Sequence, residues 1–258
     1  MTGATSWPSH VIKRGRRVVG GLLLRGLVAG LLAGLLAAGF SFLAGEPSIE
    51  RAIAFETAME QAAAQPSEPE IVSRSVQRGA GLLTAYLVYG AAVGGLFSLV
   101  FALAYGRVNG LDPKVLSALL AFAGFVAMVL VPELKYPANP PAIGAPETIG
   151  ARTALYFAML AISLLAMILA ATLALAFSAR LGSWNGALVA ATVFVAVVGL
   201  AALALPPVDE VPVNFPASVL RNFRLASIGA RAVLWAALGL TFGAMTQIWL
   251  RRGKPSRA

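Results

Sequence analysis

Apolar and polar residues alternate along this chain in blocks far longer than the period of a soluble helix or strand. Six apolar stretches approach or exceed the roughly 20 residues that a helix needs to cross a bilayer: residues 20–44, 79–105, 113–131, 153–177, 186–205 and 232–250. The first is much longer than the apolar core of a signal peptide, which favours an uncleaved span. The pattern predicts an all-α, polytopic transmembrane bundle, with a six-span domain over 19–252 and basic cytosolic tails at 1–18 and 253–258.

Charge is divided unequally between the two sides that these spans define. The two ends of the chain and the short loops after the second and fourth spans, with the span ends next to them, hold twelve Lys or Arg residues and one acid, Asp112. The other three loops, with the span ends next to them, hold eight basic and ten acidic residues. Because Lys and Arg beside a span resist translocation, we expect both termini to be cytosolic and the acidic loops to lie outside.

Composition agrees with a membrane protein, since 59% of the residues are hydrophobic and only 12% are charged. The net charge of +9 would suggest nucleic acid in a soluble protein. Here the basic residues flank apolar spans, so topology and contact with anionic lipid explain them, and no nucleic-acid binding is expected.

Small residues recur every four positions in the first two spans: Gly26, Gly30, Gly34 and Ala38, then Gly90 and Gly94. This spacing lets the backbones of two membrane helices approach closely. Glycine is common in membrane helices in general, but three consecutive matches on one stripe favour a packing role. The pattern says nothing about a substrate.

The chain also resembles itself. TIGARTALY at 148–156 matches SIGARAVLW at 227–235 by residue type, and PANPPA at 137–142 resembles PVNFPA at 212–217. A fainter copy begins at Ser75. Unless the similarity is a chance effect of apolar composition, it predicts a hairpin of two helices used three times in one orientation, with proline-rich outer loops. The hairpins would span about 20–105, 113–177 and 186–250.

The repeat places three arginines at equivalent positions, Arg78, Arg152 and Arg231, each at the outer end of an even-numbered span. An arginine there can extend to the interface, whereas one at the bilayer centre costs about 2.5–3.5 kcal/mol even on the mildest insertion scale. We therefore interpret all three as residues of the outer interface.

The second and third outer loops combine carboxylates, aromatic residues and asparagines with prolines that exclude regular helix. Their oxygen-bearing side chains suit a hard or borderline divalent cation, and the candidate ligands are Glu133, Asn139, Asp209, Glu210 and Asn214. Lys135 and Tyr136 are further candidates for the outer interface. The alternative is that the prolines only make rigid turns and the charges keep them hydrated.

The first outer loop begins with a predicted helix over 48–61, followed by an Ala-, Gln- and Pro-rich segment at 62–70 that we expect to be flexible. Glu56 falls in the middle of the apolar face of this helix, whereas Glu50 points away. A carboxylate on an apolar face needs a partner. Glu56 is therefore either paired with Arg51 or another repeat's arginine, or a further metal ligand.

Catalysis has little support in this sequence. The chain has no cysteine, and its one histidine, His10, lies in the polar N-terminal tail. No HExxH motif or Walker A loop is present. We therefore expect neither an enzyme nor a permanently bound cofactor.

Several stretches resemble the CbtA family, predicted cobalt transporter subunits of bacterial membranes: GEPSIERAIAFE (45–56), LVYGAAVGGLFSLVFALAYGR (87–107), VPELKYPANPPAIG (131–144), TALYFAML (153–160), GSWNGAL (182–188) and LPPVDEVPVNFPASVLRNFRLAS (205–227). The family motif positions that carry over are Glu56, Lys135, Asn139, Asp209 and Glu210. The resemblance implies Co²⁺ uptake linked to cobalamin synthesis across the bacterial inner membrane. It also implies a small one-span partner, CbtB, with a histidine-rich tail.

One difference from the family matters. Many relatives carry histidines in the first outer loop, whereas this chain reads AAAQPSEPE at 62–70. Either a partner's histidines capture the metal, or the loop is dispensable, or this chain moves another ion. The competing interpretation is a membrane scaffold or assembly factor that transports nothing, with its outer loops docking a partner protein. The ion, the energy source and the oligomeric state do not follow from the sequence.

Overall fold

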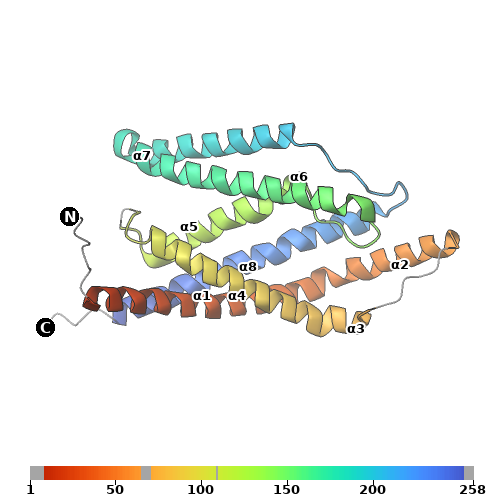
Figure 1. The fold of residues 1–258 in the computed structure, drawn as a ribbon, viewed down its shortest axis with the longest axis horizontal. Helices are drawn as coiled ribbons and strands as arrows, with labels where there is room; N and C mark the ends of the chain where they lie inside the picture. The colour runs from red at the N-terminus through yellow and green to blue at the C-terminus, as the bar shows by residue number, and fades with distance from the viewer. Residues whose placement is uncertain (1–8, 65–70, 109, 253–258) are drawn as a thin grey trace, which may run out of the picture. The chain divides into compact units, whose positions relative to one another are not determined.

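The fold was analysed in a computed structural model that describes residues 9–64, 71–108 and 110–252. The described residues form helices and no strand, which confirms the all-α prediction. In chain order the elements are α1 (Ser9–Ala44), α2 (Glu46–Ala62), α3 (Arg74–Val76), η1 (Gln77–Gly81), α4 (Leu82–Ala104), α5 (Pro113–Phe125), η2 (Val126–Leu130), α6 (Val131–Lys135), η3 (Pro146–Thr148), α7 (Ile149–Ala204) and α8 (Ala217–Arg252) (Figure 1).

Helix α1 already begins at Ser9, so part of the expected N-terminal tail is helical. Residues 1–8, the C-terminal tail at 253–258 and positions 65–70 of the expected flexible segment lie outside the described residues, as does the side chain of His10.

Five helical segments are long and apolar enough to cross a membrane: Val18–Ala44, Arg74–Ala104, Pro113–Lys135, Pro146–Ala204 and Ala217–Arg252. Two of the six predicted spans, 153–177 and 186–205, both fall within the fourth segment. The difference in number therefore depends on the shape of α7.

Helix α7 is interrupted at Gly182, where φ is 81° and ψ is 158°, a conformation that side chains other than glycine rarely adopt. Figure 1 shows the teal ribbon of α7 turning back on itself at its far end. The two halves pack together, because buried Ala166 and Ala170 share a hydrophobic cluster with Ala190 and Phe194. The shorter half, 183–204, is about 33 Å long at 1.5 Å per residue. Each half is thus long enough for the roughly 30 Å hydrocarbon core.

The ends of the helices follow local sequence. Asp112 accepts a hydrogen bond from the backbone N–H of Lys114 at 2.9 Å, and Pro113 occupies the first position of α5, as expected for an N-cap and first-turn proline. Helix α7 ends at Ala204, where Leu205 is extended (ψ 140°) ahead of Pro206 and Pro207.

The third apolar stretch is predicted to end at residue 131, but the helix does not end at Pro132. The π-helical turn η2 precedes it, and its widened hydrogen bonding continues to the N–H of Val131, which donates to the carbonyl of Val126. A proline inside a helix normally clashes with the preceding turn, and the wider π turn relieves this crowding. The helix therefore continues to Lys135, so that Glu133 lies on a helix rather than in a loop.

The chain forms two compact units, each described on its own. The first contains residues 1–36, 83–121 and 234–258. In it α1 and α4 meet at glycines: a Cβ on Gly30 would overlap the carbonyl oxygen of Gly90, and one on Gly26 would overlap that of Gly94. Gly34 likewise lies against the backbone of Tyr86.

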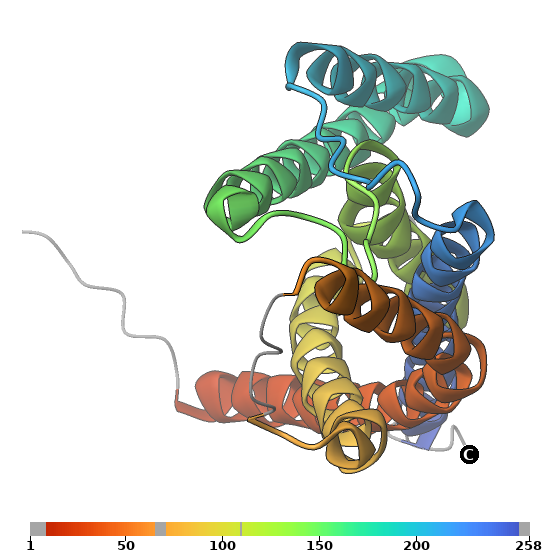
Figure 2. The ribbon, with the colours of Figure 1, turned by 90° about the vertical axis from the view of Figure 1, so that its right-hand side faces the viewer.

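The second unit contains residues 37–82 and 122–233. Here the three acidic loops of the sequence meet. Ala52 from α2, Ile143 from the loop before α7, and Phe215 and Val219 from the segment entering α8 form one buried cluster. The rings of Phe55 and Phe215 meet edge to face, with centroids 5.1 Å apart. Figure 2 shows the loops before α7 (green) and α8 (blue) running close to each other.

Candidate functional site in the outer loops

The candidate site lies where the loops before α7 and α8 meet, and a buried carboxylate forms one wall. Glu133 in the short helix α6 is only 4% exposed. Its carboxylate forms an ion pair with the guanidinium of Arg231 on α8. Burial makes an unpaired carboxylate costly, and the guanidinium of Arg231 offsets this cost by pairing with Glu133.

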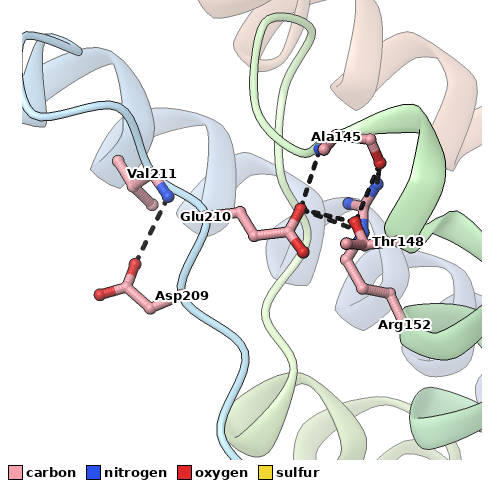
Figure 3. A network of polar contacts seen from close by, with 6 residues as sticks. All are labelled: Ala145, Thr148, Arg152, Asp209, Glu210 and Val211. Carbon is pink, nitrogen blue, oxygen red and sulfur yellow. Dashed lines mark hydrogen bonds and ion pairs between the residues drawn. The ribbon is translucent and has the colours of Figure 1, made fainter.

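A second carboxylate holds the two loops together. Glu210 accepts hydrogen bonds from the backbone N–H of Ala145 and from the hydroxyl of Thr148, both at 2.9 Å (Figure 3). Its Oε2 also lies 3.4 Å from the Nε of Arg152. Arg152 in turn donates to the hydroxyl of Thr148 and to the carbonyl of Ala145, both at 3.1 Å. The loop before α8 is thereby tied to the N-terminus of α7.

Gly144 gives the Arg152 side chain its room. A Cβ at this position would overlap the guanidinium, and its φ of +106° is itself unfavourable for residues with a side chain. The positive φ is what favours glycine here, whereas a Cβ would displace the Arg152 guanidinium from its present position.

The third arginine of the site, Arg224, is hydrogen-bonded to the side-chain amide of Asn139. Nη2 of Arg224 donates to Oδ1 of Asn139 at 2.8 Å, which links α8 to the loop before α7. The hydroxyl of Tyr136, which is otherwise buried, donates to the carbonyl of Pro206 at 2.8 Å. The Tyr136 bond joins the same pair of loops as Glu210 does, whereas the Arg224 bond joins the loop before α7 to helix α8.

These groups surround a cavity of about 330 Å³. Its charged lining consists of two carboxylates, Glu133 and Glu210, and three guanidinium groups, Arg152, Arg224 and Arg231. The remaining lining residues are Tyr136, Pro137, Ala138, Asn139, Ile143, Ile149, Thr153, Tyr156, Val208 and Val211.

Contacts within the site change the pKa of two groups. The hydrogen bond from Thr148 is the main cause that lowers the pKa of Glu210, and the Ala145 N–H and the charge of Arg152 act in the same direction against partial burial. Burial raises the pKa of the Tyr136 phenol. At neutral pH Glu210 is therefore anionic and Tyr136 is a neutral hydrogen-bond donor.

The structure brings together only some of the candidate ligands. Glu133, Asn139 and Glu210 line the cavity. Asp209 and Asn214 are exposed and do not line it. Figure 3 shows that the side chains of Asp209 and Glu210 point to opposite sides of their loop. Lys135 lies over the ring of Tyr136, 5.7 Å from its centroid.

The first outer loop contributes separate contacts. Glu56 is half-buried on α2, and within the described part of the chain it forms no ion pair with Arg51 or another arginine. Arg78 donates to Glu50 at 2.8 Å and lies over the ring of Phe42. Arg74 pairs with the buried Glu46. Thus the arginines at all three repeat positions are paired with carboxylates.

The described residues contain no group of three or more His, Cys, Asp or Glu side chains able to hold a metal ion. Both carboxylates of the cavity already face arginines, so a bare divalent cation would have to displace a guanidinium to bind there. As described, the cavity is a set of ion pairs with one extra positive charge.

Sequence inspection overlooked Arg224 and Thr148. The signal for Arg224 was its spacing: it precedes Arg231 by seven residues, which is two helical turns, so both lie on one face of α8. The prediction that the last span begins near residue 232 hid this relation, because α8 in fact begins at Ala217.

The fold and this site define a polytopic helical membrane protein with a polar cavity between loops that link its spans. A sequence model of the CbtA family, described as probable cobalt transporter subunits, matches residues 19–247. The chain therefore belongs to the CbtA family, as its motifs indicated, and this is a family of transporter subunits rather than enzymes. No curated protein and no solved structure matches the chain.

Proposed function

We propose that this protein is the membrane-spanning subunit of a system that imports divalent cobalt across the bacterial inner membrane for cobalamin synthesis. The observation that carries the proposal is the family match, which covers nearly the whole chain. The five segments long and apolar enough to cross a membrane support it. The family is described as a transporter subunit, which supports the presence of a partner protein. A small one-span, histidine-rich CbtB-like protein is the proposed partner.

We further infer six crossings with both termini in the cytosol, counting α7 as two spans. Contacts within the first unit support this arrangement. Asp112, before α5, accepts a hydrogen bond from Gln247 near the end of α8, and Arg25 of α1 lies over the ring of Trp249. The N-terminal part of α1, the start of α5 and the end of α8 therefore lie at one end of that unit, as a shared cytosolic side requires.

The three-hairpin repeat also belongs to this proposal. Its support is that Arg78, Arg152 and Arg231 each pair with a carboxylate. The two asparagines at equivalent positions differ in surroundings, since Asn139 binds Arg224 and lines the cavity whereas Asn214 is exposed. In this proposal the copies of the repeat have diverged in function at this position.

In this proposal the exposed carboxylates of the outer loops gather the cation before it enters. Asp209 is exposed, and it lies beside Glu210, whose lowered pKa keeps it charged. Carboxylates on one face raise the local concentration of cations. Weak binding suits conduction, because tight binding would trap the ion.

The alternative is a scaffold that transports nothing and docks a partner protein on its outer loops. An exposed apolar side chain there favours it, since Val213 in the loop before α8 is fully exposed. A partner protein docked on this loop would cover it.

Radioactive cobalt accumulation in cells with and without the chain separates the two functions. We expect Asp209→Asn with Glu210→Gln to lower accumulation at equal amounts of protein in the membrane. Glu147→Gln is the matched control, because Glu147 is an exposed carboxylate of η3 that does not line this cavity. Equal accumulation with and without the chain would leave the scaffold as the better explanation.

A further inference from the structure

The cavity between the outer loops has one guanidinium without a counter-charge. Arg231 is paired with Glu133, and Arg152 is paired with Glu210. Among the described residues Arg224 has no carboxylate within 4.0 Å, and its one hydrogen-bond partner is the neutral amide oxygen of Asn139. Its Nε is buried and has no partner at all. The lining therefore carries a net charge of +1 that is centred on Arg224.

The donors near this charge are arranged for an anion. Because Asn139 uses its amide oxygen to accept from Arg224, its amide nitrogen is left as a donor. Together with the guanidinium of Arg224, which has no carboxylate partner, this amide nitrogen gives the cavity N–H donors beside an uncompensated positive charge. A planar carboxylate suits such a site, since guanidinium groups bind carboxylates through parallel, charge-assisted hydrogen bonds.

The size of the cavity indicates a small organic molecule rather than a bare ion. Its volume of about 330 Å³ lies within the range of small-molecule sites, roughly 300–1,000 Å³. A bare divalent cation would need several converging oxygen or nitrogen ligands, and the described residues contain no such cluster. The surplus positive charge would also repel it.

We propose that this cavity binds a small carboxylate anion through Arg224, and that cobalt reaches the protein as an anionic complex with a small tricarboxylate. A divalent cation bound to one fully ionised tricarboxylate has a net charge of −1, which matches the surplus of the cavity. The first part stands on the cavity alone, and the second rests on the proposed transport function.

Binding of radiolabelled citrate to the purified full-length protein in detergent tests the first part. Arg224→Gln removes the surplus charge, and we expect it to weaken binding by about tenfold or more, as for a lost hydrogen bond to a charged group. Arg221→Gln is the control, because Arg221 lies one turn earlier on α8, is exposed and does not line this cavity. It should bind citrate like the original protein.

A second variant, Asn139→Asp, tests the site independently in case Arg224→Gln fails to fold. It keeps the shape of the side chain and its acceptor for Arg224 but neutralises the surplus charge, so it should also abolish citrate binding. Absence of citrate binding to the original protein, or equal binding by it and Asn139→Asp, would overturn the site.

Uptake measurements test the second part. Cells should accumulate radioactive cobalt supplied with excess citrate, and Arg224→Gln should lower that uptake. If cells take up free Co²⁺ but not the citrate complex, the second part is wrong and the transport function stands. If they take up neither while the purified protein binds citrate, the transport function fails and the carboxylate site stands.

Discussion

Glu133 on α6 and Arg231 on α8 form an ion pair in which the carboxylate is almost fully buried and the guanidinium is partly exposed. The pair joins two helices that are far apart in the sequence and forms one wall of the cavity. By contrast, the pair between Arg78 and Glu50 has both side chains about half exposed, at 45% and 51%. The two pairs should therefore differ strongly in what they contribute to stability.

We predict that Glu133→Gln destabilises the protein by about 2 kcal/mol. This is below the roughly 3–5 kcal/mol for breaking a fully buried pair, because the Arg231 side chain remains 32% exposed and can be hydrated in part. Glu50→Gln, the matched control, should cost less than about 1 kcal/mol. Thermal unfolding of both variants in detergent measures the difference, and equal losses would show that burial does not determine the strength of these pairs.

Removing the Thr148 hydroxyl should raise the pKa of Glu210. The hydrogen bond from Thr148 is the largest cause of the lowered pKa, so Thr148→Val should move the titration of Glu210 toward that of an ordinary glutamate. Carbon NMR of labelled glutamate carboxyls follows this directly. An unchanged titration would mean that Ala145 and Arg152 alone hold the carboxylate in its ionised form.

The same lowered pKa predicts how stability depends on pH. Because the pKa of Glu210 is lower in the folded than in the unfolded state, its ionised form stabilises the fold at neutral pH. This contribution is lost as the pH falls through the lowered pKa. The loss of stability on acidification should therefore be smaller in Glu210→Gln than in the original protein, and an equal loss in both would contradict the assignment.

Gly30→Ala should destabilise the contact between α1 and α4. The added methyl would overlap the carbonyl oxygen of Gly90, so the helices must separate, at a cost of about 1–3 kcal/mol. Gly39→Ala on the same helix is the control, because no atom lies within 4 Å of its added Cβ. Alanine there should leave the melting temperature unchanged or slightly higher. A similar loss in both variants would point to a general need for helix flexibility instead.

Single cysteines can test the proposed topology without background, since the chain has none of its own. Glu147→Cys and Asn214→Cys, at exposed positions of two outer loops, should react with an impermeant thiol reagent added to whole cells. Ser183→Cys, at the bend of α7, should react only after the membrane is opened. Labelling of Ser183→Cys from outside would contradict six crossings.

The sequence was informative where a property depends on neighbouring residues. The apolar lengths predicted the spanning helices, and the four-residue spacing of Gly26, Gly30 and Gly34 indicated a face that the structure places against α4. The continuation of the helix through Pro132 was missed, because it depends on a π turn that has no simple sequence signal.

The hydrogen-bond and ion-pair partners of the side chains in the site could not be predicted from neighbouring residues in the sequence. Asp209 and Glu210 are neighbours with similar chemistry, yet one faces outward and the other binds the N-terminus of α7 (Figure 3). That choice is made by the position of another loop. Likewise, Arg224 stayed unnoticed because its significance comes from having no acidic partner, which only the folded chain reveals.

The reversal of α7 at Gly182 has a consequence for the parity of the crossings. An odd number of crossings between two loops would place them on opposite faces of the bilayer. Ala52, Ile143 and Phe215, from the three acidic loops, share one buried cluster, and in the proposed topology each successive pair of these loops is accordingly separated by an even number of crossings. An unbroken α7 would supply one crossing between Ile143 and Phe215, whereas a helix that reverses at Gly182 supplies two. This single glycine would thus decide on which face everything after it emerges, including the last loop and the whole of α8.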